Sequence, residues 1–136
     1  MLSKLLKVVV SAGLLMAAVL PLAAHHSFSA EFDSSKPITL EGKVVEMEWV
    51  NPHSWLTIDV PKADGTVERW HIEGGSPSVL LRLGWNRNSL PAGTRIKVVA
   101  FQAKDGALRA SSRDIEFPDG RKMNLGGSSN TDGEKK

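Results

Sequence analysis

The sequence predicts an all-β domain with one short helix, and three observations support this. Apolar and polar residues alternate along several short segments, which is the pattern of half-buried strands. Turn-forming pairs that contain glycine, proline, asparagine or aspartate separate these segments. The chain contains no cysteine, so the apolar core must hold the fold without disulfides.

The first 24 residues have the three parts of a cleavable signal peptide. Lys4 and Lys7 make the start basic, residues 8–20 are apolar or small, and residues 21–24 end the stretch with the small residues Ala23 and Ala24 before the cut. A membrane-spanning helix needs about 20 apolar residues, so we expect cleavage, after Ala24 or Ala23, and no membrane span after processing. The predicted location is the periplasm or the exterior of the cell.

Cleavage also changes the charge balance. The full chain has 17 basic and 15 acidic side chains, and residues 1–24 contain two of the basic ones, Lys4 and Lys7, and none of the acidic ones. The mature chain therefore carries no net side-chain charge. It lacks the basic surface that proteins use to bind a phosphate backbone, so we expect no nucleic-acid partner.

Changes in composition divide the chain into four predicted parts. These are a signal peptide over residues 1–24, an N-terminal arm over residues 25–37, a β domain over residues 38–117 and a C-terminal tail over residues 118–136. The arm is polar apart from Phe28 and Phe32, which we expect to pin it to the domain. From Asn124 the chain is rich in glycine, serine, asparagine and charge, so we expect a disordered tail.

The first predicted strand begins after Pro37 and changes face part-way along. Its apolar positions are Ile38, Leu40, Gly42 and Val44 before the change, and Val45, Met47 and Trp49 after it. Such a change within one strand predicts a bulge or a sharp bend.

The next two strands form a hairpin whose loop fixes the register. Ala63-Asp64-Gly65 suits a three-residue loop with its glycine in the left-handed region. The expected core-facing pairs are Leu56 with Ile72 and Ile58 with Trp70. The expected pairs on the other face are Asp59 with Arg69, Thr57 with His71, and Trp55 with Glu73. This register places apolar residues together and opposes unlike charges, which supports it.

A short helix and two further strands complete the domain. Ser76-Pro77 predicts the start of the helix and Gly84 its end. We expect strands over residues 95–102 and about 107–117, joined by a turn at Asp105-Gly106. Three strands, one helix and two strands is the element order of the OB-fold, a five-stranded Greek-key barrel. An open sheet packed on one helix is the alternative.

Four motifs carry a resemblance to a known group of proteins. They are His25-His26-Ser27-Phe28, the run from Glu46 to His53, Leu83-Gly84-Trp85 and Pro91-Ala92-Gly93-Thr94. With these motifs the chain resembles an uncharacterised family of small bacterial periplasmic proteins with a His-His-Ser-Phe mature start and an Asn-Pro-His motif. The resemblance implies a periplasmic location and brings no established activity.

The four histidines, His25, His26, His53 and His71, are the candidate metal ligands. After cleavage at Ala24, the free amine and Nδ1 of His25 can chelate one ion, with another histidine completing a T-shaped set of nitrogens. After cleavage at Ala23, histidine stands third, and an amine, two backbone amides and an imidazole form a square plane. Both arrangements suit Cu(II), which prefers tetragonal nitrogen sites. Copper is the expected cofactor, and a merely solvated arm is the alternative.

His53 follows the Asn51-Pro52 turn and opens the second strand on the face that carries Trp55. The register separates His53 from His71 by about four residues, or roughly 13 Å, so we do not expect them to share one ion. Glu73 lies a diagonal step from His53 and is the better candidate to orient it. The alternative is that His53 only caps a backbone group of the turn.

Two functions from different classes fit this chain, and neither is enzymatic, since the sequence contains no catalytic motif. The first is copper binding, with His25 or His26 as primary ligand and His53 or His71 as a third ligand. The second is an interaction module of the cell envelope that binds a protein or glycan. Its face would carry Trp55, Arg69, His71 and Glu73, with an exposed indole available for stacking.

Overall fold

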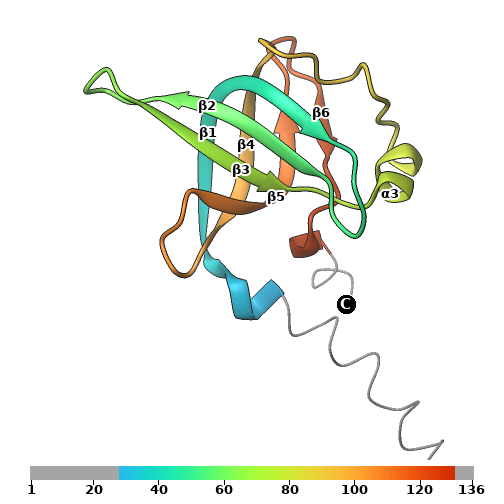
Figure 1. The fold of residues 1–136 in the computed structure, drawn as a ribbon, viewed down its shortest axis with the longest axis horizontal. Coiled ribbons are helices and arrows are strands. Elements are labelled where there is room, and N and C mark those ends of the chain that lie inside the picture. The colour runs from blue at the N-terminus through green and yellow to red at the C-terminus, as the bar shows by residue number, and fades with distance from the viewer. Residues whose placement is uncertain (1–27, 131–136) are drawn as a thin grey trace, which may run out of the picture.

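The computed structural model describes residues 28–130 of the chain, which are mostly β (Figure 1). The strands are β1 (Phe32–Glu48), β2 (Trp55–Pro61), β3 (Val67–Glu73), β4 (Arg95–Ala103), β5 (Arg109–Glu116) and β6 (Lys122–Asn124). Residues 28–31, α3 (Pro77–Arg82) and the 3₁₀ turn η1 (Ser128–Asn130) are helical. The predicted order of three strands, a helix and two strands is present, with β6 and η1 added. The expected signal peptide lies outside the described residues, as do His25 and His26.

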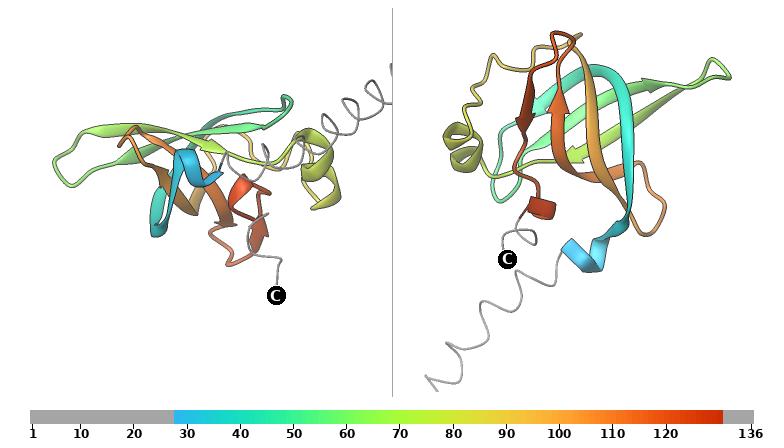
Figure 2. Two further views of the ribbon diagram at one scale, coloured as in Figure 1. Left: turned by 90° about the horizontal axis from the view of Figure 1, so that it is seen from below. Right: turned by 180° about the vertical axis from the view of Figure 1, so that it is seen from behind.

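The sheet closes into a ring. Its strand order is β3-β2-β1-β4-β5-β6 with antiparallel neighbours, and β3 also pairs with β5 in parallel. The first five strands therefore surround one core, and β6 lies along the edge of β5. The tip of the β2–β3 hairpin projects away from the ring in every view (Figures 1 and 2). Within the described residues, no helix is both long and apolar enough to cross a membrane.

β1 is bent where the sequence changes face. Val44 pairs with Ile58 and Glu46 pairs with Thr57, so Val45 is the extra residue of a bulge. Gly42 lies just before the bend, where a Cβ atom would come 2.5 Å from the backbone oxygen of Asp59. The predicted bulge is confirmed, and the absence of a side chain at Gly42 lets β1 and β2 approach closely.

The hairpin has the predicted register throughout. The paired residues are Leu56 with Ile72, Thr57 with His71, Ile58 with Trp70, Asp59 with Arg69, and Trp55 with Glu73. Gly65 in the loop has a φ of 87°, a left-handed value that glycine adopts at low cost. The loop composition therefore determines which residues of β2 and β3 face the core.

The main core fills the ring and extends under α3. Its fully buried side chains include Leu56, Ile58, Ile72, Leu80, Val98, Ile115 and Leu125. Trp70 and Trp85 are buried as predicted, and Trp49 is partly buried against the same core. α3 starts at the predicted cap, where Ser76 Oγ accepts a 3.4 Å hydrogen bond from the Val79 N–H.

The arm is more ordered than the sequence indicates. β1 begins at Phe32 rather than after Pro37. Phe28 and Phe32 are buried as expected, with Ala103 and Phe101, in a small cluster apart from the main core. The arm from residue 28 onward is therefore part of the fold.

The prediction of a disordered tail from Asn124 is wrong for residues 124–130. Leu125 is fully buried in the main core, and the indole N–H of Trp85 donates to the Asn124 carbonyl at 2.7 Å. The glycines that suggested disorder instead permit close packing, since a Cβ at Gly127 would lie 2.5 Å from the Ser112 carbonyl oxygen.

Candidate functional site

Four residues stand opposite one another on neighbouring strands and form a row across the outer face of the ring. They are Trp55 on β2, Glu73 on β3, Ser111 on β5 and Phe101 on β4. The residues beside them in sequence fill the core: Leu56, Ile72, Ala110 and Ala100. Because alternate residues of a strand face opposite sides, the row faces away from the core. We call these four residues the Glu73 row.

Both ends of the described chain cover the Glu73 row. From the N-terminal side, the ring of Phe28 packs edge-on against Phe101, with 5.9 Å between centroids. From the C-terminal side, the Ser128 N–H donates to Glu73 Oε1 at 3.0 Å, and the Ser129 N–H approaches Ser111 Oγ at 3.4 Å. Residues 28–31 and η1 lie at the same end of the ring in Figures 1 and 2.

Glu73 carries a carboxylate, yet only 4% of the residue's surface is exposed to solvent. Burying a carboxylate is costly unless other groups hydrogen-bond to it or neutralise it. Its Oε1 atom accepts from the Ser128 N–H at 3.0 Å and from the Ser111 hydroxyl at 3.4 Å. His53 Nδ1 lies 3.7 Å from the same oxygen. These three contacts hold the carboxylate in one orientation.

His53 lies in the loop before β2, and two backbone hydrogen bonds fix this loop to the end of β3. The Ser54 N–H donates to the Gly75 carbonyl at 2.9 Å, and the Gly74 N–H donates to the Ser54 carbonyl at 2.8 Å. His53 Nδ1 is buried and has no hydrogen-bond partner among the described residues, whereas the side chain as a whole is 40% exposed. Nδ1 therefore faces Glu73, and the Nε2 edge of the ring faces outward.

The remaining candidates have other partners. His71 is exposed, and its Nδ1 lies 3.2 Å from Thr57 Oγ1. Arg69 donates two hydrogen bonds to Asp59, at 2.8 and 2.9 Å, and hydrogen bonding by Arg69 holds the pKa of the Asp59 carboxyl below its usual value. Trp55 is half-buried beside Glu73 rather than fully exposed.

The structure brings His53 to Glu73, as the sequence predicts, and gives His53 and His71 different partners. Within residues 28–130, no three His, Cys, Asp or Glu side chains lie close enough to hold a metal ion together.

Sequence reasoning missed Ser111, Ser128 and Phe101. Ser111-Ser112 lies between Ala110 and Arg113 in β5, and both serines are fully buried. Two adjacent small polar residues inside a predicted core strand are a signal of a buried polar cluster, because each buried hydroxyl needs a partner. The role of Ser128 leaves no such signal, because it acts through its backbone N–H.

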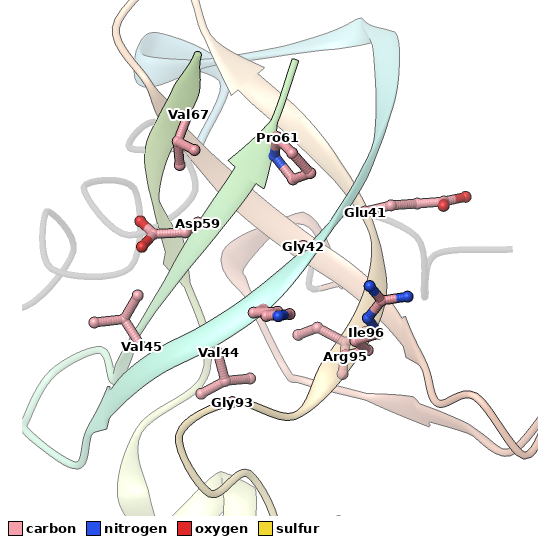
Figure 3. A pocket seen from close by; sticks show the side chains of 11 residues that line it. Glu41, Gly42, Val44, Val45, Asp59, Pro61, Val67, Gly93, Arg95 and Ile96 are labelled. Carbon is pink, nitrogen blue, oxygen red and sulfur yellow. The ribbon is translucent and has the colours of Figure 1, made fainter. Parts of the chain in front are cut away.

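A groove of about 650 Å³ lies elsewhere on the ring, between β1 and the projecting hairpin (Figure 3). Its apolar wall includes Val44, Val45 and Val67, and Asp59 and Arg95 lie among its charged lining residues. Neither His53 nor His71 lines it, and none of the four residues of the Glu73 row does. The groove is therefore separate from the Glu73 row.

Comparison with protein families gives one match. The model of the family DUF6152, described as a family of unknown function, matches residues 12–112. The chain belongs to DUF6152. Neither the curated proteins nor the solved structures contain a match.

The DUF6152 match agrees with the resemblance to an uncharacterised family. It extends across His25, His26, His53 and Glu73, and ends at Ser112. β6 and η1 lie beyond the matched region, and η1 covers part of the Glu73 row. Membership of DUF6152 itself implies no activity.

Proposed function

We propose that this DUF6152 protein is exported to the periplasm and binds one Cu(II) ion through the histidines at its processed N-terminus. The supporting observation is the contact of Phe28 with Phe101. This contact anchors the arm on the Glu73 row, three residues after His25 and on the same face as His53. Because only three residues separate His25 from Phe28, His25 must lie near the Phe28–Phe101 contact.

The length of the arm supports this placement. Three residues span at most about 10 Å, which limits the distance between His25 and Phe28. Phe101 and Glu73 are two strands apart, which is also about 10 Å at the usual strand spacing. A chain that starts at His25 is therefore long enough to bring its amine and imidazole to Glu73 and its neighbour His53.

The donor chemistry favours copper over other divalent ions. A free amine and an imidazole on the same residue supply two nitrogens in one chelate, and further histidines add imidazole nitrogens. Nitrogen ligands in a tetragonal plane suit Cu(II). No thiolate is available to favour a softer metal or zinc, because the chain has no cysteine.

The scaffold suits a binding role. We interpret the ring as a barrel of the OB type, because its strands follow the order β1-β2-β3-β5-β4 with α3 between β3 and β4. The core inside this ring is filled by side chains, so ligands would bind to its outer face or to the arm. The proposed function is metal binding without catalysis.

The alternative is an interaction module that uses Trp55, Arg69, His71 and Glu73 to bind a protein or glycan. Two observations make it the weaker candidate. Arg69 is already paired with Asp59 and His71 with Thr57, and Glu73 is buried. These polar groups would have to give up their present partners to bind another molecule.

Copper titration of two forms of the protein tests the proposal. The first form is isolated from the periplasm, and its intact mass should correspond to a start at His25. The second form also starts at His25 but is acetylated on its terminal amine, which converts this amine into an amide without a free lone pair. We expect one tightly bound Cu(II) in the first form and binding at least about 100-fold weaker in the second.

Three results would contradict the proposal. Equal affinity of both forms would exclude the terminal amine as a ligand, and an intact mass that retains residues 8–20 would exclude export with cleavage. Affinity that does not fall below about pH 6.5 would also count against histidine ligands, because protons and metal compete for the same nitrogens.

A further inference from the structure

We propose that the groove between β1 and the projecting hairpin binds a fatty acid in its carboxylate form (Figure 3). The carboxylate lies between Lys43 and Arg95, and the alkyl chain lies against the apolar wall. The groove has a volume of about 650 Å³, which is within the range of about 300–1,000 Å³ that is usual for small-molecule sites. This inference goes beyond copper binding and does not depend on it, because the groove is separate from the Glu73 row.

The groove opens where β1 and β2 stop pairing. Their last pair at this end is Lys43 with Asp59, and the same register would next place Glu41 opposite Pro61. Pro61 has no N–H and therefore cannot donate a hydrogen bond to β1. From this point β1 pairs with β4 alone, while the hairpin projects away from it (Figure 1). The space between the two diverging strands is the groove.

Two basic side chains line the groove without partners. Lys43 on β1 and Arg95 on β4 stand directly opposite each other, and both are exposed. Like charges opposite each other on neighbouring strands destabilise a sheet. In the part of the chain that the structure describes, neither side chain has a hydrogen bond or an ion pair. An anion between them would relieve the repulsion and supply the missing partner.

The two acidic residues of the groove do not neutralise this pair. The carboxylate of Glu41 lies 3.3 Å from Lys97 Nζ, and that of Asp59 lies 2.8 Å from Arg69 Nε. Each acid is thus balanced by a base that does not line the groove. The charge that remains is positive, so the groove complements an anionic ligand.

The apolar surface lies on the opposite side of β1 from Arg95. In Figure 3, Val67 and Asp59 lie on the hairpin side of β1, and Arg95 lies on the β4 side. Val67 is 60% exposed and Val45 is half-buried, so a ligand can cover them and remove apolar surface from water. Asp59 disfavours a second anionic group beside the valines. A ligand with one anionic end and one apolar end therefore fits best.

The test is an NMR titration of the whole protein with decanoate, at concentrations below those at which decanoate forms micelles. We expect the amide signals of residues 41–45 and 93–96 to shift in a saturable way. An exposed ion pair contributes up to about 5-fold in affinity, so Lys43→Gln and Arg95→Gln should each weaken binding by about 2–5-fold and their combination by more. Arg82→Gln, which changes an exposed arginine on α3 outside the groove, should leave the affinity unchanged.

The length of the alkyl chain tests the apolar wall. Each fully buried methylene strengthens binding by about 3–4-fold, so we expect decanoate to bind at least about 10-fold more tightly than butyrate. Val67→Asp should weaken the binding of decanoate and leave that of butyrate unchanged, because butyrate is too short to extend from the basic pair to Val67. Circular dichroism should show the same fold for all variants.

Several outcomes would overturn the inference. Decanol, the uncharged analogue, must bind more weakly than decanoate, and equal affinity would show that Lys43 and Arg95 do not bind the head group. Decanoate that causes no saturable shift, or shifts only signals outside the groove, would exclude this site. If an acetylated valine–threonine peptide with a free carboxylate binds there and decanoate does not, the groove binds a peptide strand instead. Copper affinity should be the same in all these variants, so failure of this inference leaves the copper proposal standing.

Discussion

Glu73 is nearly fully buried, and its surroundings explain how an acidic side chain occupies that position. A backbone N–H and a serine hydroxyl donate to one of its oxygens, and an imidazole lies beside it. At the opposite end of the same hairpin, the Asp59–Arg69 pair has good geometry but lies at the surface. The buried Glu73 is held in one orientation by its neighbours, whereas a surface ion pair such as Asp59–Arg69 contributes little to stability.

Asp59 gives a prediction about acid stability. The hydrogen bond from Arg69 lowers the pKa of Asp59 in the folded protein, so the ionised form is favoured by folding. Its stabilising effect is fully present above the unfolded pKa of about 3.9 and is lost as pH falls through the lower folded pKa. We expect Asp59→Asn to unfold at slightly lower urea concentration than the parent at pH 7, and this difference to shrink toward pH 2.

The measurement is urea unfolding of both proteins at the two pH values. Glu48→Gln, which changes an exposed acid on the neighbouring strand β1, should leave the midpoint unchanged at both. A deficit of Asp59→Asn that is as large at pH 2 as at pH 7 would show that the charge of Asp59 does not matter.

Single residues of the site were predictable only where local sequence determines their position. The proximity of His53 to Glu73 follows from the hairpin register, which the loop at Asp64-Gly65 fixes. Ser128 reaches Glu73 from 55 positions along the chain. No local pattern encodes a contact over that separation.

At the scale of elements, the C-terminal segment differs most from what its composition indicates. Residues 118–136 were expected to form a tail, yet β6 pairs with β5 and η1 contacts the Glu73 row. One leucine among glycines and serines creates no periodic pattern, so the packing of this segment cannot be predicted from the sequence. The hairpin and α3, by contrast, carry turn and cap residues that specify them locally.

Leu125→Ala tests whether this segment belongs to the folded domain. Leu125 is fully buried, and removing a buried leucine side chain typically costs about 2–5 kcal/mol through lost burial and the cavity that remains. We expect the free energy of unfolding, measured in urea, to fall by an amount in this range.

The matched control is Leu81→Ala, because Leu81 is 61% exposed on α3. A surface substitution of this kind should change the free energy of unfolding by no more than about 0.5 kcal/mol. Equal effects of the two substitutions would mean that residues 124–130 do not pack on the ring in solution.

At the scale of the whole molecule, the parallel pairing of β3 with β5 makes one ring of five strands and aligns the Glu73 row across it. The element order predicts the number and sequence of strands, but this closing pair joins distant segments and was not predictable from periodicity. Closure brings the anchor of the N-terminal arm, the loop of His53 and the C-terminal segment to the same outer face. The proposed copper site depends on that convergence.

The location of the bound ion tests the account most directly. Cu(II) is paramagnetic, so it broadens the NMR signals of backbone amides close to it. Protein that starts at His25 should be compared with and without one equivalent of Cu(II). We predict that the amide signals of Phe28, His53 and Ser111 disappear, while those of Gly65 at the hairpin tip and Gly120 in the β5–β6 turn remain. Signal loss centred on the hairpin tip or around His71, with His53 and Phe28 unaffected, would contradict a copper site beside the Glu73 row.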